Sequence, residues 1–449
     1  MGDLASIVKA YDIRGVVPDQ LDEGVAEAIG AAFAVLTGAG TILTVHDMRT
    51  SSAPLAAAFG RGAASQGADV LAAGLGSTDM LYYGSGELGV PGAMVTASHN
   101  PPQYNGIKLC RAGARPVGIE TGLADIKDLA ERSRVPASAP GSVTRTDLLP
   151  GYAGYLGKLV DLSTIRPLTV AVDAGNGMAG HTVPKVFEGL PITLIPLYLE
   201  LDGTFPNHEA NPIEPANVRD LQRAVTEHRA DIGLAFDGDA DRCFVVDERG
   251  QIVSPSVLTA LIASRELARE PGATIIHNLI TSRGVPEIIA ERGGVAVRTR
   301  VGHSFIKAEM ARTGAVFGGE HSGHFYFRDF WFADSGMLAA LHTLAALGGQ
   351  AGPLSALLAS CTRYHASGEI NSLVADQAAA TAVVRRAFAG RPGVGTDELD
   401  GLTVSTGSWW FNLRPSNTEP LLRLNVEADT EDTMTALRDE VLGLVRKDL

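Results

Sequence analysis

The alternation of short β-type runs with helical segments constrains the fold more than any other feature of this chain. Thr41–Val45 and Val70–Gly74 are typical of strands, and Ala53–Gln66 between them is typical of a helix. The same order begins again at Leu168–Asp173 and at Thr274–Asn278. Because strands that alternate with helices pair mainly in parallel, this order predicts several α/β layers.

The C-terminal region has a different pattern. Helical segments at 376–388 and 431–446 enclose two strand-like runs, which is typical of a small α+β domain with antiparallel strands. A chain of 449 residues is long enough for about three or more domains of ordinary size. We therefore predict three successive α/β domains with mixed, mainly parallel sheets around a central cleft, at 1–143, 144–253 and 254–364, and an α+β domain at 365–449.

Composition excludes several classes of protein. The formal net charge of −14 disfavours nucleic acid and anionic membrane surfaces as partners. The stretch 335–362 lacks charged residues, but glycines and a proline interrupt it, so we expect two short core helices and no membrane span. The three cysteines are far apart and form no disulfide framework, and the first residues contain no signal-peptide pattern. We expect a cytoplasmic protein.

One predicted strand delivers a serine into a polar loop. The apolar run 93–97 leads directly to Ser98 and His99, and Pro101-Pro102 follows. Functional groups of open α/β sheets gather at the carboxyl ends of strands, and the prolines exclude a helix here. We therefore expect Ser98 on a stiff, exposed loop. A turn with a capping serine is the alternative, and no G-x-S-x-G motif supports an acyl-transfer triad.

A second polar loop contains three acidic residues at alternate positions. Asp237, Asp239 and Asp241 follow the apolar run Ile232–Phe236. Carboxylates this close repel one another, and a hard divalent cation is an economical way to hold them together. The spacing resembles the start of an EF-hand loop, but Arg242 stands where that loop requires glycine. We predict that the three aspartates bind Mg²⁺ and leave coordination positions for substrate oxygens.

Two more loops, with two shorter segments, carry polar groups suited to a ligand. The glycine-rich segment 318–324 surrounds Glu320 with hydroxyl and imidazole groups, a pattern that suits a polyhydroxylated ligand. The segment 414–420 combines Arg414 with serine, asparagine and threonine, the groups of a phosphate site, although a hairpin turn is the alternative. The segments 11–15 and 301–304 add a cation and an imidazole.

A glycine motif offers a rival interpretation. Gly175, Gly177 and Gly180 satisfy G-x-G-x-x-G after a predicted strand, with Glu200 about where a ribose ligand would lie in a nicotinamide dehydrogenase. That class leaves the acidic loop and the Ser98 loop unexplained. We therefore interpret the motif as a structural turn into a helix.

In their order along the chain, the loops of Ser98, Asp237, Glu320 and Arg414 resemble the α-D-phosphohexomutase superfamily. The sequences Tyr-Asp-Ile-Arg-Gly at 11–15, Thr-Ala-Ser-His-Asn-Pro-Pro-Gln-Tyr-Asn-Gly-Ile-Lys at 96–108 and Glu-His-Ser-Gly-His at 320–324 are similar to its bacterial phosphomannomutase/phosphoglucomutase branch. His321 stands where phosphoglucosamine mutases usually have glutamine and some dual-specificity relatives have methionine. The preference for mannose or glucose therefore stays open.

The resemblance implies a role for each loop. Ser98 would carry the phosphoryl group, and its phosphate would complete a Mg²⁺ shell with the three aspartates. Catalytic roles would fall to Ser98, Arg14, Lys108, Arg242 and His303, with Lys108, His303 and His99 as the acid–base candidates. Substrate binding would involve Tyr11, Gly302, Glu320, Ser322, His324, Arg414, Ser416, Asn417 and Thr418.

The resemblance also implies the reaction. We expect interconversion of mannose 6-phosphate and mannose 1-phosphate through a phosphoserine enzyme and hexose 1,6-bisphosphate, which is also the activator. The glucose phosphates are further candidate substrates. A phosphoglucosamine mutase is the alternative, and a metal-dependent sugar-phosphate phosphatase is a weaker one. A bisphosphate that turns over within the cleft requires a mobile fourth domain, with a hinge expected near residue 365. The partners would be hexose phosphates alone, and the chain a monomer or homodimer.

Overall fold

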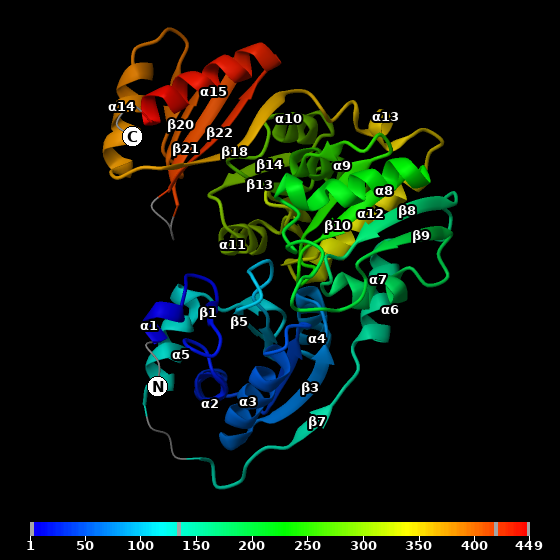
Figure 1. Ribbon diagram of the computed structural model, residues 1–449, viewed down its shortest axis with the longest axis vertical. Coiled ribbons are helices and arrows are strands. Elements are labelled where there is room, and N and C mark those ends of the chain that lie inside the picture. Colours follow the sequence, from blue (N-terminus) through cyan, green and yellow to red (C-terminus); the bar gives the residue numbers. More distant parts are fainter. Residues whose placement is uncertain (1–3, 133–135, 417–420, 447–449) are drawn as a thin grey trace.

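Four β-sheets follow one another along the chain. The structure is a computed structural model that describes residues 4–132, 136–416 and 421–446. Figure 1 shows the sheets along an arc, with the first and the last at its two ends. The predicted architecture of three mixed sheets and one antiparallel sheet is confirmed.

The first sheet has the strand order β1-β5-β4-β2-β3-β7, with β6 beside β5. Strands β4, β2, β3 and β7 are parallel, whereas β5 runs antiparallel to β4 and β1. The strands are β1 (Ile13–Val16), β2 (Thr41–His46), β3 (Asp69–Leu75), β4 (Gly92–Val95), β5 (Tyr104–Arg111), β6 (Arg115–Pro116) and β7 (Val143–Arg145). The helices are α1 (Leu4–Ile7), α2 (Glu23–Thr37), α3 (Ser52–Ser65), α4 (Thr78–Leu88), η1 (Ile119–Thr121) and α5 (Leu123–Ala130).

The second and third sheets repeat one design, in which parallel strands on one side meet an antiparallel hairpin on the other. Their orders are β12-β11-β10-β8-β9 and β14-β13-β15-β16-β17. The strands are β8 (Leu168–Asp173), β9 (Ile192–Leu197), β10 (Ile232–Phe236), β11 (Cys243–Asp247), β12 (Ile252–Val253), β13 (Thr274–Asn278), β14 (Val295–Thr299), β15 (Phe317–Gly319), β16 (Phe325–Phe327) and β17 (Ala333–Asp334). The helices are α6 (Leu149–Leu159), α7 (Ala179–Val186), η2 (Pro215–Val218), α8 (Arg219–His228), α9 (Pro255–Arg269), α10 (Gly284–Glu291), α11 (His303–Thr313), η3 (Arg328–Phe330), α12 (Gly336–Gly348) and α13 (Leu354–Leu358).

The fourth sheet is antiparallel throughout and has the order β18-β22-β21-β20-β19. Its elements are β18 (His365–Leu373), α14 (Gln377–Phe388), β19 (Gly395–Asp397), β20 (Leu402–Ser405), β21 (Trp409–Pro415), β22 (Leu421–Ala428) and α15 (Glu431–Val445). It packs around its own apolar core, which includes Phe388, Phe411 and Val441. The second and third sheets instead share one continuous core, which extends to Leu43 of β2. The expected hinge near residue 365 falls where the shared core ends, and it stays a prediction.

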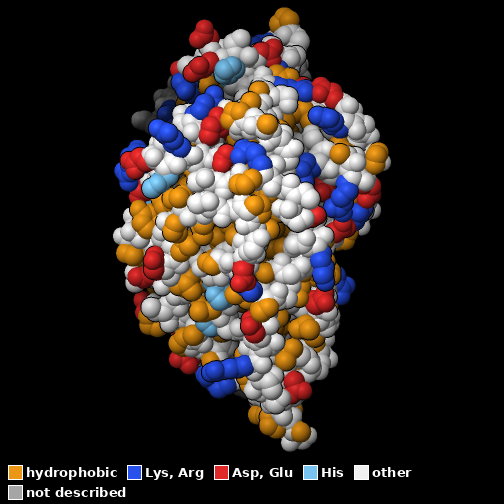
Figure 2. Space-filling model, turned by 90° about the vertical axis from the view of Figure 1, so that its right-hand side faces the viewer, with side chains coloured by type: hydrophobic (Ala, Val, Ile, Leu, Met, Phe, Trp, Pro, Cys, Tyr) orange, Lys and Arg blue, Asp and Glu red, His pale blue; other side chains and the backbone are white. Residues whose placement is uncertain are grey.

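The stretch 335–362 forms α12 and α13, as the glycines between them indicated. In the part of the chain that the structure describes, none of the helices combines the length and the apolar character needed to cross a bilayer. The face drawn in Figure 2 carries acidic and basic side chains side by side around apolar ones.

Each of the four predicted loops begins where a strand ends. Strand β4 leads to Ser98, β10 to Asp237, β15 to Glu320 and β21 to Ser416. Strand ends at one edge of a sheet lie together, and consecutive sheets turn these edges toward the inside of the arc (Figure 1). The alternation of strand, polar loop and helix therefore positions the site.

Two helices of the first domain approach each other so closely that only glycine fits between them. A Cβ on Gly62 of α3 would lie 1.9 Å from the Glu27 carbonyl oxygen of α2, and one on Gly30 would lie 2.0 Å from the Phe59 oxygen. Contacts below about 3 Å with main-chain atoms require the backbone to move. These glycines set the distance between α2 and α3.

We predict that Gly62→Ala destabilises the protein although alanine favours helix. The clash should lower the free energy of unfolding by about 2 kcal/mol, as overpacked sites do. Gly157→Ala on α6 is the matched control, since nothing lies within 4 Å of the added carbon; it should be neutral or stabilising by roughly 0.5–1 kcal/mol. Calorimetric melting of both variants measures the difference, and equal melting temperatures would contradict the prediction.

Candidate active site

Ser98 occupies a strained position in contact with the acidic loop. Its φ of 50° is left-handed, and its Oγ donates a hydrogen bond of 2.7 Å to Asp237 Oδ2. His99 Nδ1 lies 3.2 Å from the same Oγ. The prediction of an exposed serine is wrong, because only 5% of Ser98 is accessible. Gly238 explains the burial, since a Cβ there would lie 2.3 Å from the Ser98 carbonyl oxygen.

The three aspartates converge as predicted. Oxygens of Asp237, Asp239 and Asp241 lie within 4.8 Å of one another, and all three side chains are buried. Lys108 Nζ contacts Asp239 Oδ2 at 2.6 Å and Asp241 Oδ2 at 2.7 Å. The Oδ1 atoms of Asp239 and Asp241 are buried and accept no hydrogen bond from any residue that the structure describes. A buried carboxylate oxygen without a donor is costly, so this site fits a hard cation.

The protonation of these groups follows from their surroundings. Burial, together with Asp241 and Asp239, raises the pKa of Asp237 to about 7 although Arg242 opposes the shift. Burial works in the same direction on Asp239, but Lys108 outweighs it and lowers the pKa of that carboxyl. Burial would lower the pKa of Lys108, yet Asp239 and Asp241 hold it well above its usual value. Lys108 is therefore charged and is a poor general base.

Two arginines flank the serine. Arg242 Nε donates to Asp237 Oδ2 at 3.0 Å, and Arg14 Nη1 donates to Asn100 Oδ1 at 2.6 Å. Burial, followed by the charges of Arg242 and Arg14, lowers the pKa of His99 well below its usual value. His99 is therefore neutral beside the Ser98 hydroxyl. The structure thus places Arg242 on the carboxylate that binds Ser98, Arg14 on a residue of the same loop and the His99 imidazole beside the hydroxyl group.

Glu320 and its neighbours form a second polar group, and Tyr11 of the first domain lies beside it. Glu320 is buried and accepts hydrogen bonds from Tyr326 at 2.9 Å, from the Gly302 amide at 3.2 Å and from Ser322 at 3.4 Å. A Cβ on Gly302 would lie 3.1 Å from the Tyr11 hydroxyl. A cavity of about 380 Å³ between the first and third domains has Tyr11 in its wall, but the residues that bind Glu320 do not line it. The side chain of His303 lies outside the described part of the structure.

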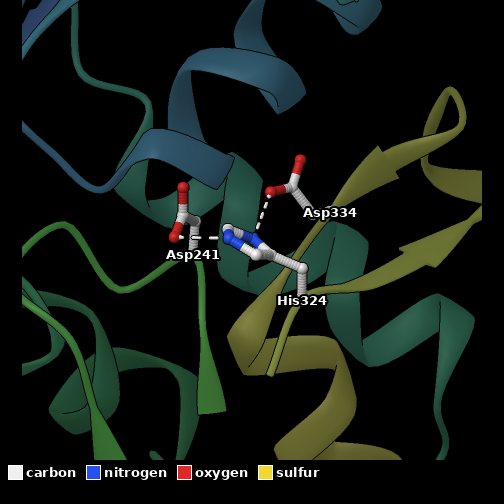
Figure 3. A group of neighbouring side chains, drawn as sticks. All are labelled: Asp241, His324 and Asp334. Carbon is white, nitrogen blue, oxygen red and sulfur yellow. Dashed lines mark hydrogen bonds and ion pairs between the residues drawn. The ribbon is translucent and has the colours of Figure 1, made fainter. Parts of the chain in front are cut away.

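His324 connects the Glu320 loop to the acidic loop (Figure 3). Its Nδ1 lies 2.9 Å from Asp334 Oδ2 and 3.9 Å from Asp241 Oδ1. Burial lowers the pKa of His324, but Asp241 and Asp334 outweigh it and raise the pKa. These three residues form a second possible metal group. Lys307 Nζ contacts Asp334 Oδ1 at 2.6 Å. This group has one carboxylate fewer than the triad of Asp237, Asp239 and Asp241, so it fits a hard cation less well.

In the fourth domain, Arg414 pairs with a residue that sequence reasoning missed. Arg414 Nη2 donates to Glu369 Oε2 at 2.6 Å, and Arg423 Nη1 donates to Glu369 Oε1 at 3.3 Å. His321 Nε2 approaches the same carboxylate at 3.6 Å, which joins the Glu320 loop to the fourth domain. Although burial alone would raise the pKa of Glu369, His321 and Arg414 lower it to about 2.

The other predicted residues of this loop are described only in part. Ser416 Oγ lies 3.4 Å from Arg423 Nη2. Two further predicted residues, Asn417 and Thr418, lie outside the described residues.

The G-x-G-x-x-G segment supports the acidic loop. The Met178 amide donates to the Gly238 carbonyl at 2.9 Å, and a Cβ on Gly177 would lie 2.7 Å from the same oxygen. Asn176 Nδ2 binds the main-chain oxygen of Glu200. The interpretation of this motif as a structural turn agrees with these contacts.

Thr78 and Asp334 are further site residues that no sequence motif marked. Thr78 Oγ1 donates to Asp239 Oδ2 at 2.6 Å across the junction of the first two domains. Asp334 ends β17, a strand of only two residues. Neither lies in a loop whose composition stands out, so only the folded arrangement identifies them.

The chain matches models of all four domains of one family. The matches are phosphoglucomutase/phosphomannomutase alpha/beta/alpha domain I at residues 5–134, domain II at 150–250 and domain III at 254–364, and the C-terminal domain at 369–444.

Characterised relatives and a solved structure agree over the full length. The chain is 40% identical to a phosphomannomutase of Escherichia coli and 42% identical to a protein of Xanthomonas campestris named phosphohexose mutases; each alignment covers 98% of both chains. A crystal structure of a phosphoglucomutase/phosphomannomutase family protein from Burkholderia thailandensis superimposes with a TM-score of 0.89 at 33% identity, over 100% of this chain and 99% of the other. This chain therefore belongs to the phosphoglucomutase/phosphomannomutase family.

Proposed function

We propose that this protein is a phosphohexomutase that interconverts mannose 6-phosphate and mannose 1-phosphate, and also accepts the glucose phosphates. The reaction passes through a phosphoserine at position 98 and a bound hexose 1,6-bisphosphate. The observation that carries the proposal is the 2.7 Å hydrogen bond from Ser98 Oγ to Asp237, within a triad of buried carboxylates. Relatives named phosphomannomutase, similar over the full length, support the same substrate class.

The residues around Ser98 suit phosphoryl transfer. Arg242 and Lys108 contact the carboxylates beside Ser98, and Arg14 contacts Asn100 of the same loop. This positive charge favours a phosphoryl group carrying negative charge on several oxygens. The buried loop excludes water and so favours transfer to a sugar hydroxyl over hydrolysis. The sequence offered Lys108, His303 and His99 as acid–base candidates, and the structure adds His324. Asp334 holds His324 through Nδ1, which leaves Nε2 for proton exchange with a sugar hydroxyl.

The acidic triad fits Mg²⁺, which we assign to Asp237, Asp239 and Asp241 with a phosphoserine oxygen. When bound, Mg²⁺ supplies Lewis-acid stabilisation of the negative charge on phosphoryl and serine oxygens. The chain's own part is to hold the three carboxylates in place. Thr78 orients Asp239, Arg242 orients Asp237, and Lys108 neutralises the excess charge.

The fourth domain holds the phosphate that is not reacting. Arg414 and Arg423 pair with the Glu369 carboxylate, and Arg423 also donates to Ser416 Oγ. The two guanidinium groups and the hydroxyl suit a phosphate dianion. Glu320 and Ser322 bind sugar hydroxyls between the two phosphate positions. The bisphosphate reverses its orientation between the two transfers, so the fourth domain must release it and then bind it again.

We also infer the setting in which the enzyme acts. Cys110, Cys243 and Cys361 are all free, which agrees with a reducing cytoplasm. Hexose phosphates are the proposed partners, with hexose 1,6-bisphosphate as activator, and the chain acts as a monomer or homodimer. The domain boundaries at 143, 253 and 364 stay predictions.

The substrate is tested by following ³¹P signals of mannose, glucose and glucosamine 1-phosphates with Mg²⁺ and a trace of bisphosphate. We expect each mannose or glucose 1-phosphate signal to be replaced by that of the 6-phosphate, with little inorganic phosphate, and the highest kcat/KM for mannose. Release of inorganic phosphate as the main product would identify a phosphatase. Preference for glucosamine 1-phosphate would identify the alternative mutase.

Ser98→Ala should remove turnover, because it removes the hydroxyl group that we propose to carry the phosphoryl group. We expect kcat to fall by at least about 10⁴-fold, as for other nucleophile deletions. Intact mass measured after incubation with bisphosphate should show a phosphoryl group on the wild-type protein and none on the variant. Ser65→Ala, which removes a hydroxyl that binds only local groups of α3, is the control. Full activity of Ser98→Ala would refute the proposed function.

Asp239→Asn should weaken Mg²⁺ binding, because it removes one of the three negative charges. Mg²⁺ bound only to the native state raises the melting temperature, and we expect that rise to need at least roughly tenfold more Mg²⁺ in the variant. Asp247→Asn, at the far end of β11, is the control for a buried aspartate outside the triad. An unchanged Mg²⁺ dependence in Asp239→Asn would contradict the metal assignment.

A further inference from the structure

Arg49 binds main-chain carbonyl groups of the Ser98 loop. It lies after β2, outside the four loops that carry the proposed chemistry, and its side chain is 1% exposed. Its Nη2 donates to the carbonyl oxygens of Ser98 at 2.8 Å and Asn100 at 2.6 Å. Its Nη1 donates to those of Pro101 at 2.9 Å and Tyr104 at 3.1 Å. One guanidinium group thus holds three carbonyl groups of the loop between β4 and β5 and the carbonyl group of the first residue of β5.

Asp47 completes a closed network around Ser98. The Ser98 amide donates to Thr96 Oγ1 at 2.9 Å, and Thr96 Oγ1 donates to Asp47 Oδ2 at 2.6 Å. That carboxylate lies 3.3 Å from Arg49 Nε, and Arg49 Nη2 in turn donates to the Ser98 carbonyl oxygen. Both main-chain polar groups of Ser98 therefore belong to one ring of interactions. Ser52 Oγ holds the other Asp47 oxygen at 2.5 Å.

This network explains the unusual backbone of Ser98. A non-glycine residue at φ 50° costs roughly 1–3 kcal/mol and persists only where its surroundings enforce it. The enforcing contacts here are the amide bond to Thr96 and the carbonyl bond to Arg49. With the backbone held in this way, the Ser98 side chain points to Asp237.

Arg49 also lies at the junction with the second domain. The Phe205 ring packs 5.0 Å from its guanidinium carbon, and a Cβ on Gly203 would lie 2.5 Å from Arg49 Cα. The acidic loop touches the same serine through Gly238. The groups that fix Ser98 and those that fix the aspartates therefore meet at one point.

We propose that Arg49 is a positioning residue that sets the reactive conformation of Ser98 against the acidic triad. The proposal rests on the proposed function and adds a residue to it. Arg49 touches neither the triad carboxylates nor the Ser98 hydroxyl; it acts through the carbonyl groups of the loop. A lysine cannot replace it, because one ammonium group lacks the planar fork that reaches two pairs of carbonyl groups. Displacement of a reacting group by about 1 Å can cost a hundredfold in rate.

The test compares Arg49→Lys, Arg49→Ala and wild-type enzyme with Mg²⁺ and bisphosphate activator. We expect kcat to fall about a hundredfold in both variants while KM for the sugar 1-phosphate changes less than about threefold, since the Glu320 and Arg414 loops are untouched. Millimolar guanidinium chloride, far below denaturing concentrations, should restore part of the activity of Arg49→Ala in a saturable way. Hydrogen exchange of the amides in 96–106 should accelerate in both variants.

Arg166→Ala is the matched control. Arg166 also binds an aspartate, Asp231, and the carbonyl groups of Pro167 and Gln350, but lies away from Ser98. Its loss should lower stability without changing kcat, exchange in 96–106 or the response to guanidinium. Should Arg49→Ala fail to fold, Arg49→Lys decides the question through kcat and exchange.

Two outcomes separate the inference from the function on which it rests. If the wild-type enzyme is active while Arg49→Lys keeps its kcat and its slow exchange in 96–106, the role of Arg49 is refuted and the proposed function stands. If the wild-type enzyme turns over no hexose phosphate, the proposed function fails, whereas fast exchange in 96–106 of the Arg49 variants still supports the contact with the loop.

Discussion

The rest of the site depends on three carboxylates held together in a buried place. Asp237, Asp239 and Asp241 would repel one another strongly at this separation. Lys108 and Arg242 balance part of the charge, and two carboxylate oxygens still accept no hydrogen bond from the described residues. The remaining negative charge attracts a cation and, through it, phosphoryl oxygens. The positions of Ser98 and of the nearby cations are constrained by the need to balance the negative charge of the three carboxylates.

The fold meets this requirement by bringing strand ends from successive sheets together. Each sheet contributes one loop to the inside of the arc (Figure 1), so groups distant in sequence can meet, as Ser98 and Asp237 do at 2.7 Å. Glycines allow the closest approaches: Gly238 lets the acidic loop touch the Ser98 loop, and Gly177 lets a supporting turn touch Gly238. The fourth domain keeps a separate core and meets the third through polar pairs such as His321 with Glu369 and through a small apolar cluster of Leu279, Ile280 and Trp410. Such an interface suits a domain that opens and closes.

Much of this arrangement could be predicted from sequence, because its signals are local. Alternating apolar runs indicated the sheets, and the polar residues after β10 and β15 indicated the loops. The exposure of Ser98 was predicted wrongly, since burial there comes from Gly238, which is 140 residues away. Glu369 and Asp334 could not be found for the same reason: each is an ordinary acidic residue until a cation from another element lies beside it.

The sequence by itself determined which chemical groups are available and which loop carries each of them. A run of alternate aspartates favours a cation, because neighbouring carboxylates repel one another. The tertiary structure decided which groups meet and in what state of charge. Lys108 stays charged because two nearby carboxylates raise its pKa. His99 stays neutral because burial and the charges of two arginines lower its pKa. Those states depend on distances between domains, and short-range patterns carry no information about such distances.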